Sequence, residues 1–144
     1  MITVLGLWDP VWMDPARTER RLWKQTIKAY AVDTWGMVPP RGGPFSSPVQ
    51  YETPAEMLAA HDGPRTFLIA PDSVPHGHAR RYELAEYEHP GRAIYVLGNT
   101  ADGLAKHVRP CDDVVSMRTT VRAHMFGHAV ICAVLYDRQS KGAP

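Results

Sequence analysis

Runs of consecutive apolar residues recur along the chain, and each is bounded by a proline, a glycine or a charged residue. The first run, residues 2–8 (ITVLGLW), ends at Asp9-Pro10, and similar runs occupy residues 65–71 and 93–98. A strand that is covered on both faces of a sheet is apolar throughout, whereas a half-exposed strand alternates apolar and polar residues. The runs therefore predict buried strands. Residues 32–39 and 113–117 predict two more.

The segment between the first two predicted strands has the periodicity of an amphipathic helix. Within residues 16–30, apolar side chains recur at helical spacing, namely Leu22, Trp23, Ile27 and Tyr30. Basic side chains recur on the other side, namely Arg17, Arg20 or Arg21, Lys24 and Lys28. We therefore expect a helix with one apolar and one basic face.

Further helices are predicted between and after the later strands. Residues 53–61 begin with Thr53, Pro54 and, three positions after the threonine, Glu56, which is the pattern of a capped helix. A helical turn is expected at 102–108 and a closing helix at 123–138. Two segments are expected to be irregular: the loop at 39–48 (PPRGGPFSSP), and the polar segment 72–92 with one short strand.

Strands that are apolar throughout and alternate with helices indicate an α/β fold. We expect a mostly parallel sheet with helices on both faces. In such sheets, ligands bind beyond the carboxyl ends of the strands. The turns after Ala70, Leu97 and Ser116 are therefore the candidate binding positions.

Composition and charge narrow the possible classes of protein. The 144 residues, 44% of them hydrophobic, fit one compact domain over 1–144. A net charge of +1 excludes a uniformly basic nucleic-acid-binding protein, although a basic stripe still allows phosphate contacts. Cys111 and Cys132 belong to no CxxC or zinc pattern, and no basic signal region or run of ~18 apolar residues is present. We therefore expect a cytoplasmic protein without membrane contact.

The turn GNTADG, residues 98–103, is glycine-bounded but matches no common phosphate-binding motif. It lacks the GxGxxG spacing of a dinucleotide-binding fold, and no Lys-Ser or Lys-Thr pair follows its second glycine. A turn that packs against a flat ligand needs a residue without a side chain and with a free choice of φ. Gly98 fits that need, and it fits a purely structural turn as well.

Three motifs occur in the order and at the spacing of a known family. They are IYVLGNTADGL at 94–104, CDDVVSM at 111–117 and HMFGHAVICAVLYDR at 124–138. Together they resemble the C-terminal half of the SpoU-type SPOUT methyltransferases. The segment WKQTIKAYAVDTWGMVP at 23–39 is similar to the first helix and second strand of that family. The resemblance covers most of the chain.

The resemblance implies a C-terminal deep trefoil knot, bound S-adenosylmethionine and a homodimer. The apolar surface of LWKQTIKAY and MFGHAVICAVLYD predicts that the dimer forms through the first and last helices. It also implies RNA, either tRNA or rRNA, as the substrate, with no appended RNA-binding domain, and DNA is not expected as a partner. Carried over by position, the cofactor contacts are Leu97, Gly98, Asn99, Gly103, Ser116, Met117, Met125 and Phe126. We expect Gly98→Val to abolish cofactor binding and to leave the fold largely intact.

The sequence departs from the family at positions that carry chemistry. Thr100 stands where the family has a glutamate, and Phe126 stands at the asparagine of its Ser-Leu-Asn motif. One register of the first helix puts the asparagine and the catalytic arginine of the family at Glu19 and Gln25. The other register puts them at Arg17 and Trp23, so neither restores the pair.

A ribose 2′-hydroxyl is a weak acid, and its methylation is helped by a base or by stabilisation of the developing oxyanion. The candidates for that role are Arg17, Arg20 and Arg21. Two functions remain open at this point. One is an S-adenosylmethionine-dependent RNA 2′-O-methyltransferase; the alternative is a knotted dimer without catalysis that binds RNA or the cofactor.

Histidines offer a competing metal hypothesis. His124 and His128 are four residues apart on the closing helix, and His76 and His78 add two more imidazoles. No glutamate follows His124 as in HExxH, and helices at interfaces commonly carry partly buried histidines. The sequence therefore predicts no metal. Cys132 lies in an apolar run and is expected to pack as a small hydrophobic residue.

Overall fold

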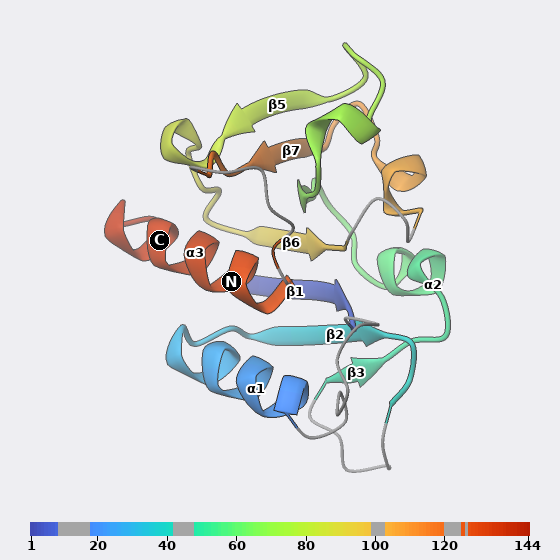
Figure 1. The fold of residues 1–144 in the computed structure, drawn as a ribbon, viewed down its shortest axis with the longest axis vertical. Helices are drawn as coiled ribbons and strands as arrows, with labels where there is room; N and C mark the ends of the chain where they lie inside the picture. Colours follow the sequence, from blue (N-terminus) through green and yellow to red (C-terminus); the bar gives the residue numbers. More distant parts are fainter. Residues whose placement is uncertain (9–17, 42–47, 99–102, 120–124, 126) are drawn as a thin grey trace.

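The structure is a computed structural model that describes residues 1–8, 18–41, 48–98, 103–119, 125 and 127–144. All five predicted strands are present and belong to one seven-stranded sheet (Figure 1). They are β1 (Ile2–Leu7), β2 (Thr34–Val38), β4 (Thr66–Leu68), β6 (Ala93–Leu97) and β7 (Asp113–Ser116).

Two short strands form the edges of this sheet. β3 (Val49–Gln50) follows the Pro/Gly/Ser-rich segment, and β5 (Arg80–Glu83) is the short strand expected within 72–92. The order is β3-β2-β1-β6-β4-β7-β5, and every neighbouring pair is parallel. The expected parallel sheet is confirmed. β3 was not predicted, because a two-residue strand beside prolines has no periodicity.

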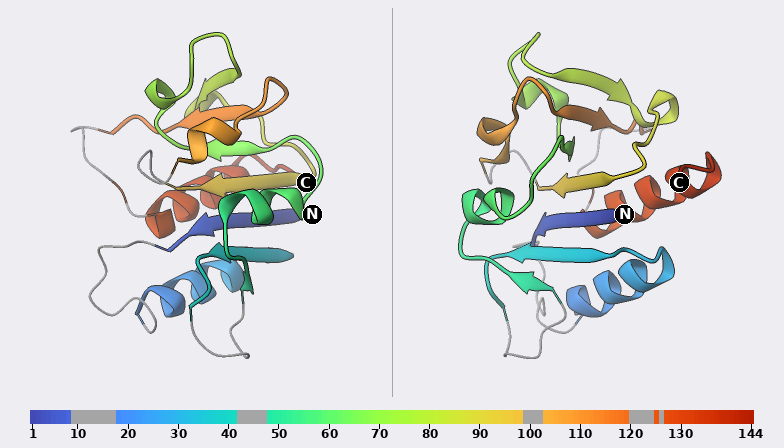
Figure 2. Two further views of the ribbon diagram at one scale, coloured as in Figure 1. Left: turned by 90° about the vertical axis from the view of Figure 1, so that its right-hand side faces the viewer. Right: turned by 180° about the vertical axis from the view of Figure 1, so that it is seen from behind.

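One face of the sheet is covered by the first and last helices. α1 (Arg20–Ala29) and α3 (Gly127–Ser140) contribute Trp23 and Ile131 to an apolar cluster that contains Tyr95 of β6. The 3-10 helix η3 (Leu84–Glu86) packs against the same cluster. Figures 1 and 2 show α1 and α3 side by side from different directions.

The opposite face is covered by shorter elements. α2 (Pro54–Ala59) and the 3-10 helices η2 (Pro71–Ser73) and η5 (Leu104–His107) lie on this side (Figure 2). A second cluster joins Met57 and Leu104 to Ile94, the neighbour of Tyr95 in β6. Because successive strand residues point to opposite faces, both sides of β6 are buried. The expected helices on both faces are confirmed.

The apolar and basic faces expected for α1 are both present. Trp23 is fully buried and stacks on Trp35 of β2, with 6.1 Å between ring centroids. The side chains of Arg21, Lys24 and Lys28 are exposed. The apolar face therefore holds the helix on the sheet and leaves a basic ridge in solvent.

The predicted cap of α2 is confirmed. The Thr53 hydroxyl accepts a hydrogen bond from the Glu56 main-chain N–H at 3.2 Å, and the Glu56 carboxylate accepts one from the Glu52 N–H at 3.0 Å. Pro54 opens the helix. These bonds satisfy N–H groups that a helix start leaves without intrahelical partners.

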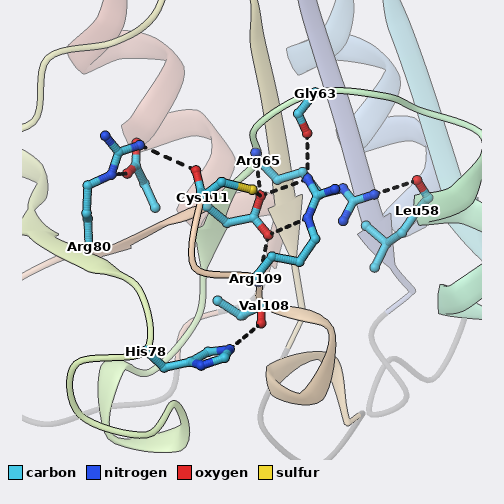
Figure 3. A network of polar contacts seen from close by, with 10 residues as sticks. Leu58, Gly63, Arg65, His78, Arg80, Val108, Arg109 and Cys111 are labelled. Carbon is cyan, nitrogen blue, oxygen red and sulfur yellow. Dashed lines mark hydrogen bonds and ion pairs between the residues drawn. The ribbon is translucent and has the colours of Figure 1, made fainter.

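A buried carboxylate ties the starts of β4 and β7 together at the amino edge of the sheet (Figure 3). Asp112 is fully buried and accepts hydrogen bonds from the main-chain N–H groups of Arg65 (3.0 Å) and Arg109 (2.8 Å). The Arg109 guanidinium donates to the same carboxylate at 3.0 Å and to the Gly63 carbonyl at 2.7 Å. Burial acts to raise the pKa of Asp112, but these hydrogen bonds outweigh it and hold the pKa below its usual value.

The C-terminal part of α3 is anchored by a second buried network. The His89 ring lies 2.6 Å from the Tyr95 hydroxyl and 2.9 Å from the Asp137 carboxylate. Arg138 is 3% exposed and donates to the Pro90 carbonyl at 2.7 Å. These bonds fix α3 to β6 and to the loop before it.

Within the described ranges, no helix has the length and apolar character needed to cross a membrane.

Candidate functional site

The three turns that the sequence marks as binding positions lie at one edge of the sheet. They follow β4, β6 and β7, which are neighbours in the order β6-β4-β7. Because these strands are parallel, their carboxyl ends meet at the same edge. The fold therefore brings the residues around Ala70, Gly98 and Ser116 together, although they are far apart in sequence.

Gly98 follows β6 and is enclosed by side chains of the protein itself. A Cβ atom on Gly98 would lie 2.3 Å from Leu104 Cδ1 and 2.8 Å from Leu7 Cδ1. Its φ is not in the left-handed region, so the expectation of an unusual φ is wrong. The structure also argues against the expectation that Gly98→Val leaves the fold intact, since the added atoms would collide with the core. Whether Gly98 contacts a cofactor stays a prediction.

Gly103 has the backbone conformation that favours glycine. Its φ is +71°, and it directly precedes the first turn of η5. Residues with a Cβ atom rarely adopt this conformation. Gly103 therefore sets the direction in which the chain enters η5.

Ser116 ends β7 and contacts a carboxylate that the sequence did not point to. The Ser116 hydroxyl donates to Glu83 Oε1 at 3.3 Å and lies 3.5 Å from the Tyr82 carbonyl oxygen. Glu83 is paired with Ser116 in the parallel register of β5 and β7. Val114 belongs to the cluster on the α2 side, so by alternation Ser116 points to that same face. Glu83 was missed because its segment is polar and carries no motif.

An open hollow of about 450 Å³ lies after β4, beside η2. Arg81 lines it, and its guanidinium donates to the carbonyls of Val74 and, at 2.8 Å, Pro75. The turn after Ala70 thus borders a mainly polar hollow. It is lined by Asp72, Ser73, Val74, Pro75, His76 and Arg81.

A charged cluster lies at the carboxyl ends of β1 and β2, where α1 begins. Arg20 donates from Nη2 to the Arg41 carbonyl, and its Cζ lies 5.8 Å from the Trp8 ring centroid. Arg41 Nη1 lies 3.9 Å from Glu19 Oε2, and Glu19 is 2% exposed. Arg41 comes from the segment 39–48, which the sequence predicts to be an irregular loop. Arg41 was not predicted as a site residue, because nothing in the local sequence marks its partners.

The other predicted site residues have separate positions. Arg21 and Gln25 are exposed on α1, whereas Trp23, which one register placed at the catalytic arginine, is fully buried. Leu97 is 2% exposed with its side chain in the core, so it offers only main-chain groups. Met117 and Met125 are half-buried. Outside the described residues are Arg17, Asn99, Thr100, His124 and Phe126.

His128 and Cys132 join α3 to α1. The Thr26 hydroxyl lies 2.9 Å from His128 Nε2 and 3.2 Å from Cys132 Sγ. Burial lowers the pKa of His128 and favours its neutral form. Cys132 therefore makes a polar contact that its apolar sequence context did not predict. In the part of the chain that the structure describes, no three His, Cys, Asp or Glu side chains are placed to hold a metal ion.

The groups at the carboxyl edge suit S-adenosylmethionine. Main-chain groups at Leu97 and Gly98 and the thioether of Met117, which directly follows β7, are the kinds of group that pack against an adenine ring. The Glu83 carboxylate, 3.3 Å from the Ser116 hydroxyl, is the kind of group to which an ammonium donates hydrogen bonds. These groups are therefore suited to a ligand that combines a flat heterocycle with an amino acid.

Comparisons with known proteins connect the chain to RNA methyltransferases through its fold. No protein-family profile and no curated relative matches the sequence. A structure solved to study the 2-OH methylation of C/U34 on tRNA is 16% identical, with a TM-score of 0.62 over 99% of this chain and 92% of that chain. A candidate RNA methyltransferase from Bacillus anthracis is 11% identical, with a TM-score of 0.61 over 100% of this chain and 96% of that chain. The parallel α/β fold expected from the sequence is therefore confirmed, and both of these structures share it.

Proposed function

We propose that this chain is an S-adenosylmethionine-dependent RNA methyltransferase that modifies a ribose 2′-hydroxyl of tRNA. The observation that carries the proposal is the fold match along almost the whole of both chains to a structure concerned with 2-OH methylation on tRNA. The clustering of the predicted binding turns at one carboxyl edge supports it. The same match favours tRNA over rRNA as the RNA class.

In this proposal the cofactor lies against the turns that follow β6 and β7. Its contacts are the predicted residues Leu97, Gly98, Asn99, Gly103, Ser116, Met117, Met125 and Phe126. We add Glu83, because its carboxylate lies next to Ser116 on the same face of the sheet. A carboxylate there would pair with the ammonium group of the cofactor.

S-adenosylmethionine supplies a methyl group that its sulfonium already activates. The protein is left with two tasks: holding the 2′-hydroxyl in line and stabilising the negative charge that develops on its oxygen. Arg17, Arg20 and Arg21 are the candidates for the second task. Of the two that the structure describes, Arg20 has its guanidinium held at the carboxyl edge, through the Arg41 carbonyl and the Trp8 ring.

We also propose the C-terminal knot and a homodimer through α1 and α3. α3 is apolar on more than the face that packs on the sheet, and Tyr136 on it is 65% exposed. Large apolar side chains left on a helix surface favour a protein interface. Light scattering at micromolar concentration is expected to give the mass of a dimer, and a monomer would contradict this part of the proposal.

The alternative is a knotted dimer that binds RNA or the cofactor without catalysis. The observation in its favour is Gln25, which is exposed and uncharged at a position where one register expects the catalytic arginine. A glutamine can donate a hydrogen bond to an oxyanion but cannot neutralise its charge.

Calorimetry with S-adenosylmethionine and S-adenosylhomocysteine tests the cofactor site directly. We expect both ligands to bind one site per chain, and Glu83→Gln to weaken both, because both carry the ammonium group. Glu86→Gln, an exposed carboxylate three residues further on, is the matched control and should leave both affinities unchanged. The absence of binding by either ligand would contradict the proposal.

A further inference from the structure

Arg41 is held at the carboxyl end of β2 through its main chain. Its N–H donates to Gln50 Oε1 at 2.6 Å, and its carbonyl accepts from the Arg20 guanidinium. Gln50 belongs to β3, and Arg20 belongs to the first turn of α1. The position of Arg41 is thus fixed from two sides without the use of its own side chain.

Among the described residues, none accepts a hydrogen bond from one N–H group of the Arg41 guanidinium. This group is Nη1, which is buried. Its distance of 3.9 Å to Glu19 Oε2 makes an ion pair but is too long for a hydrogen bond. Nη1 itself is covered, whereas the Arg41 side chain as a whole is 26% exposed, so part of the side chain is open to solvent. An unsatisfied guanidinium N–H favours an acceptor oxygen, and a ligand that draws the side chain outward would supply one.

The charges around Arg41 favour an anion. Among the described residues, the cluster contains the guanidinium groups of Arg41 and Arg20 and the carboxylate of Glu19. Arg20 already uses Nη2 on the Arg41 carbonyl and lies over Trp8. Arg41 is therefore the member of the cluster that is best placed to accept a new partner.

The cluster lies close to the proposed cofactor turn. β2 is separated from β6 only by β1 in the sheet. At roughly 4.8 Å per strand, the ends of β2 and β6 are about 10 Å apart. A nucleotide is of similar size. When the acceptor ribose of an RNA strand lies at the β6 turn, a neighbouring phosphate of that strand therefore lies near Arg41.

We propose that Arg41 binds a backbone phosphate of the RNA substrate next to the acceptor ribose, and that Glu19 and Arg20 are its positioning residues. The proposal rests on the proposed function and extends it to the way in which the RNA is held. A guanidinium matches a phosphate with two parallel N–H···O bonds, which a lysine ammonium cannot reproduce. Glu19 keeps the guanidinium in one orientation before RNA arrives.

The test measures binding of in vitro transcribed tRNA at a series of KCl concentrations. Arg41→Ala is expected to weaken tRNA binding roughly ten-fold, as for the loss of hydrogen bonds to a charged group. It should also reduce the slope of log affinity against log salt by roughly 0.7 to 0.9, the value for one phosphate contact. Arg41→Lys should keep most of the salt slope and lose part of the affinity.

Two further variants keep the result interpretable. Arg41→Ala removes one partner of the buried Glu19 carboxylate, so the double variant Glu19→Gln/Arg41→Ala also removes the negative charge from that buried position and should fold. Arg92→Ala is the matched control, because Arg92 is exposed and precedes β6 at the opposite edge of the sheet. It should leave both the affinity and the salt slope unchanged.

The outcomes separate this inference from the proposed function. If the unchanged protein binds neither tRNA nor S-adenosylhomocysteine, the proposed function fails. If the unchanged protein binds both, and the folded Arg41 variants bind tRNA with the same affinity and salt slope as Arg92→Ala, the phosphate contact is wrong and the proposed function stands. S-adenosylhomocysteine affinity should be the same in all these variants.

Discussion

Gly98 lies between the side chains of Leu7 and Leu104, where an added Cβ atom would come within 2.8 Å and 2.3 Å of them. Gly98→Val is therefore expected to lower the free energy of unfolding by roughly 1–3 kcal/mol through overpacking. Urea unfolding measures the loss. Gly91→Ala is the control, since its Cβ would meet only Pro144 at 3.6 Å. Equal stability of Gly98→Val and the unchanged protein would mean that the turn after β6 is not packed as described.

His89 makes stability depend on pH. Burial lowers its pKa by more than the hydrogen bond and charge of Asp137 raise it, with Lys141 and Arg138 lowering it further. The unfolded chain takes up a proton near pH 6.5, whereas the folded chain takes it up only at lower pH. In that interval the unfolded state binds more protons, so stability falls as the pH falls. His61, His107 and His128, whose pKa values burial also lowers, act in the same direction.

The midpoint of thermal unfolding is therefore expected to be lower at pH 5.5 than at pH 7.5. In His89→Gln this difference should be smaller, because one of the contributing groups has been removed. A variant with the same pH dependence as the unchanged protein would contradict the role of His89.

The sheet depends on a buried contact at the amino ends of its strands. At the amino edge, Asp112 accepts hydrogen bonds from two main-chain N–H groups and from Arg109, and so joins the starts of β4 and β7. Asp112→Ala would leave these donors unsatisfied and should cost roughly 3–5 kcal/mol of unfolding free energy. Asp62→Ala removes an exposed carboxylate in the same region and should cost little. Similar losses in the two variants would rule out the role given to Asp112.

The strands and long helices were predictable because each carries its own periodic or continuous apolar pattern. The apolar run at 93–98 became β6, whose residues are all buried, and Thr53 capped α2 as its sequence indicated. Glu83 and Arg41 carry no such pattern. Glu83 is recognised as a site residue only through its hydrogen bond with Ser116, 33 residues away. Arg41 is recognised only through its ion pair with Glu19 at the start of α1. Contacts of this kind depend on strand order, which local sequence does not encode.

For the whole molecule, the order β6-β4-β7 has the largest functional consequence. It places β4 between β6 and β7, which both follow β4 along the chain. The turns after these three strands therefore lie together at the carboxyl ends of the sheet. The sequence predicted which turns to examine but not their order in space. The family motifs predicted the fold, and the fold match over 99% of the chain confirmed it. The cofactor, the RNA and the dimer are proposals, because they depend on combinations of side chains whose positions no single motif determines.

The central claim is that this edge of the sheet transfers a methyl group to tRNA. The most direct measurement is nucleoside mass spectrometry of in vitro transcribed tRNA after incubation with the protein and S-adenosylmethionine. We expect a ribose-methylated nucleoside that is absent when the protein or the cofactor is omitted. Unmethylated tRNA under conditions in which both ligands are shown to bind would contradict the claim and favour the non-catalytic alternative.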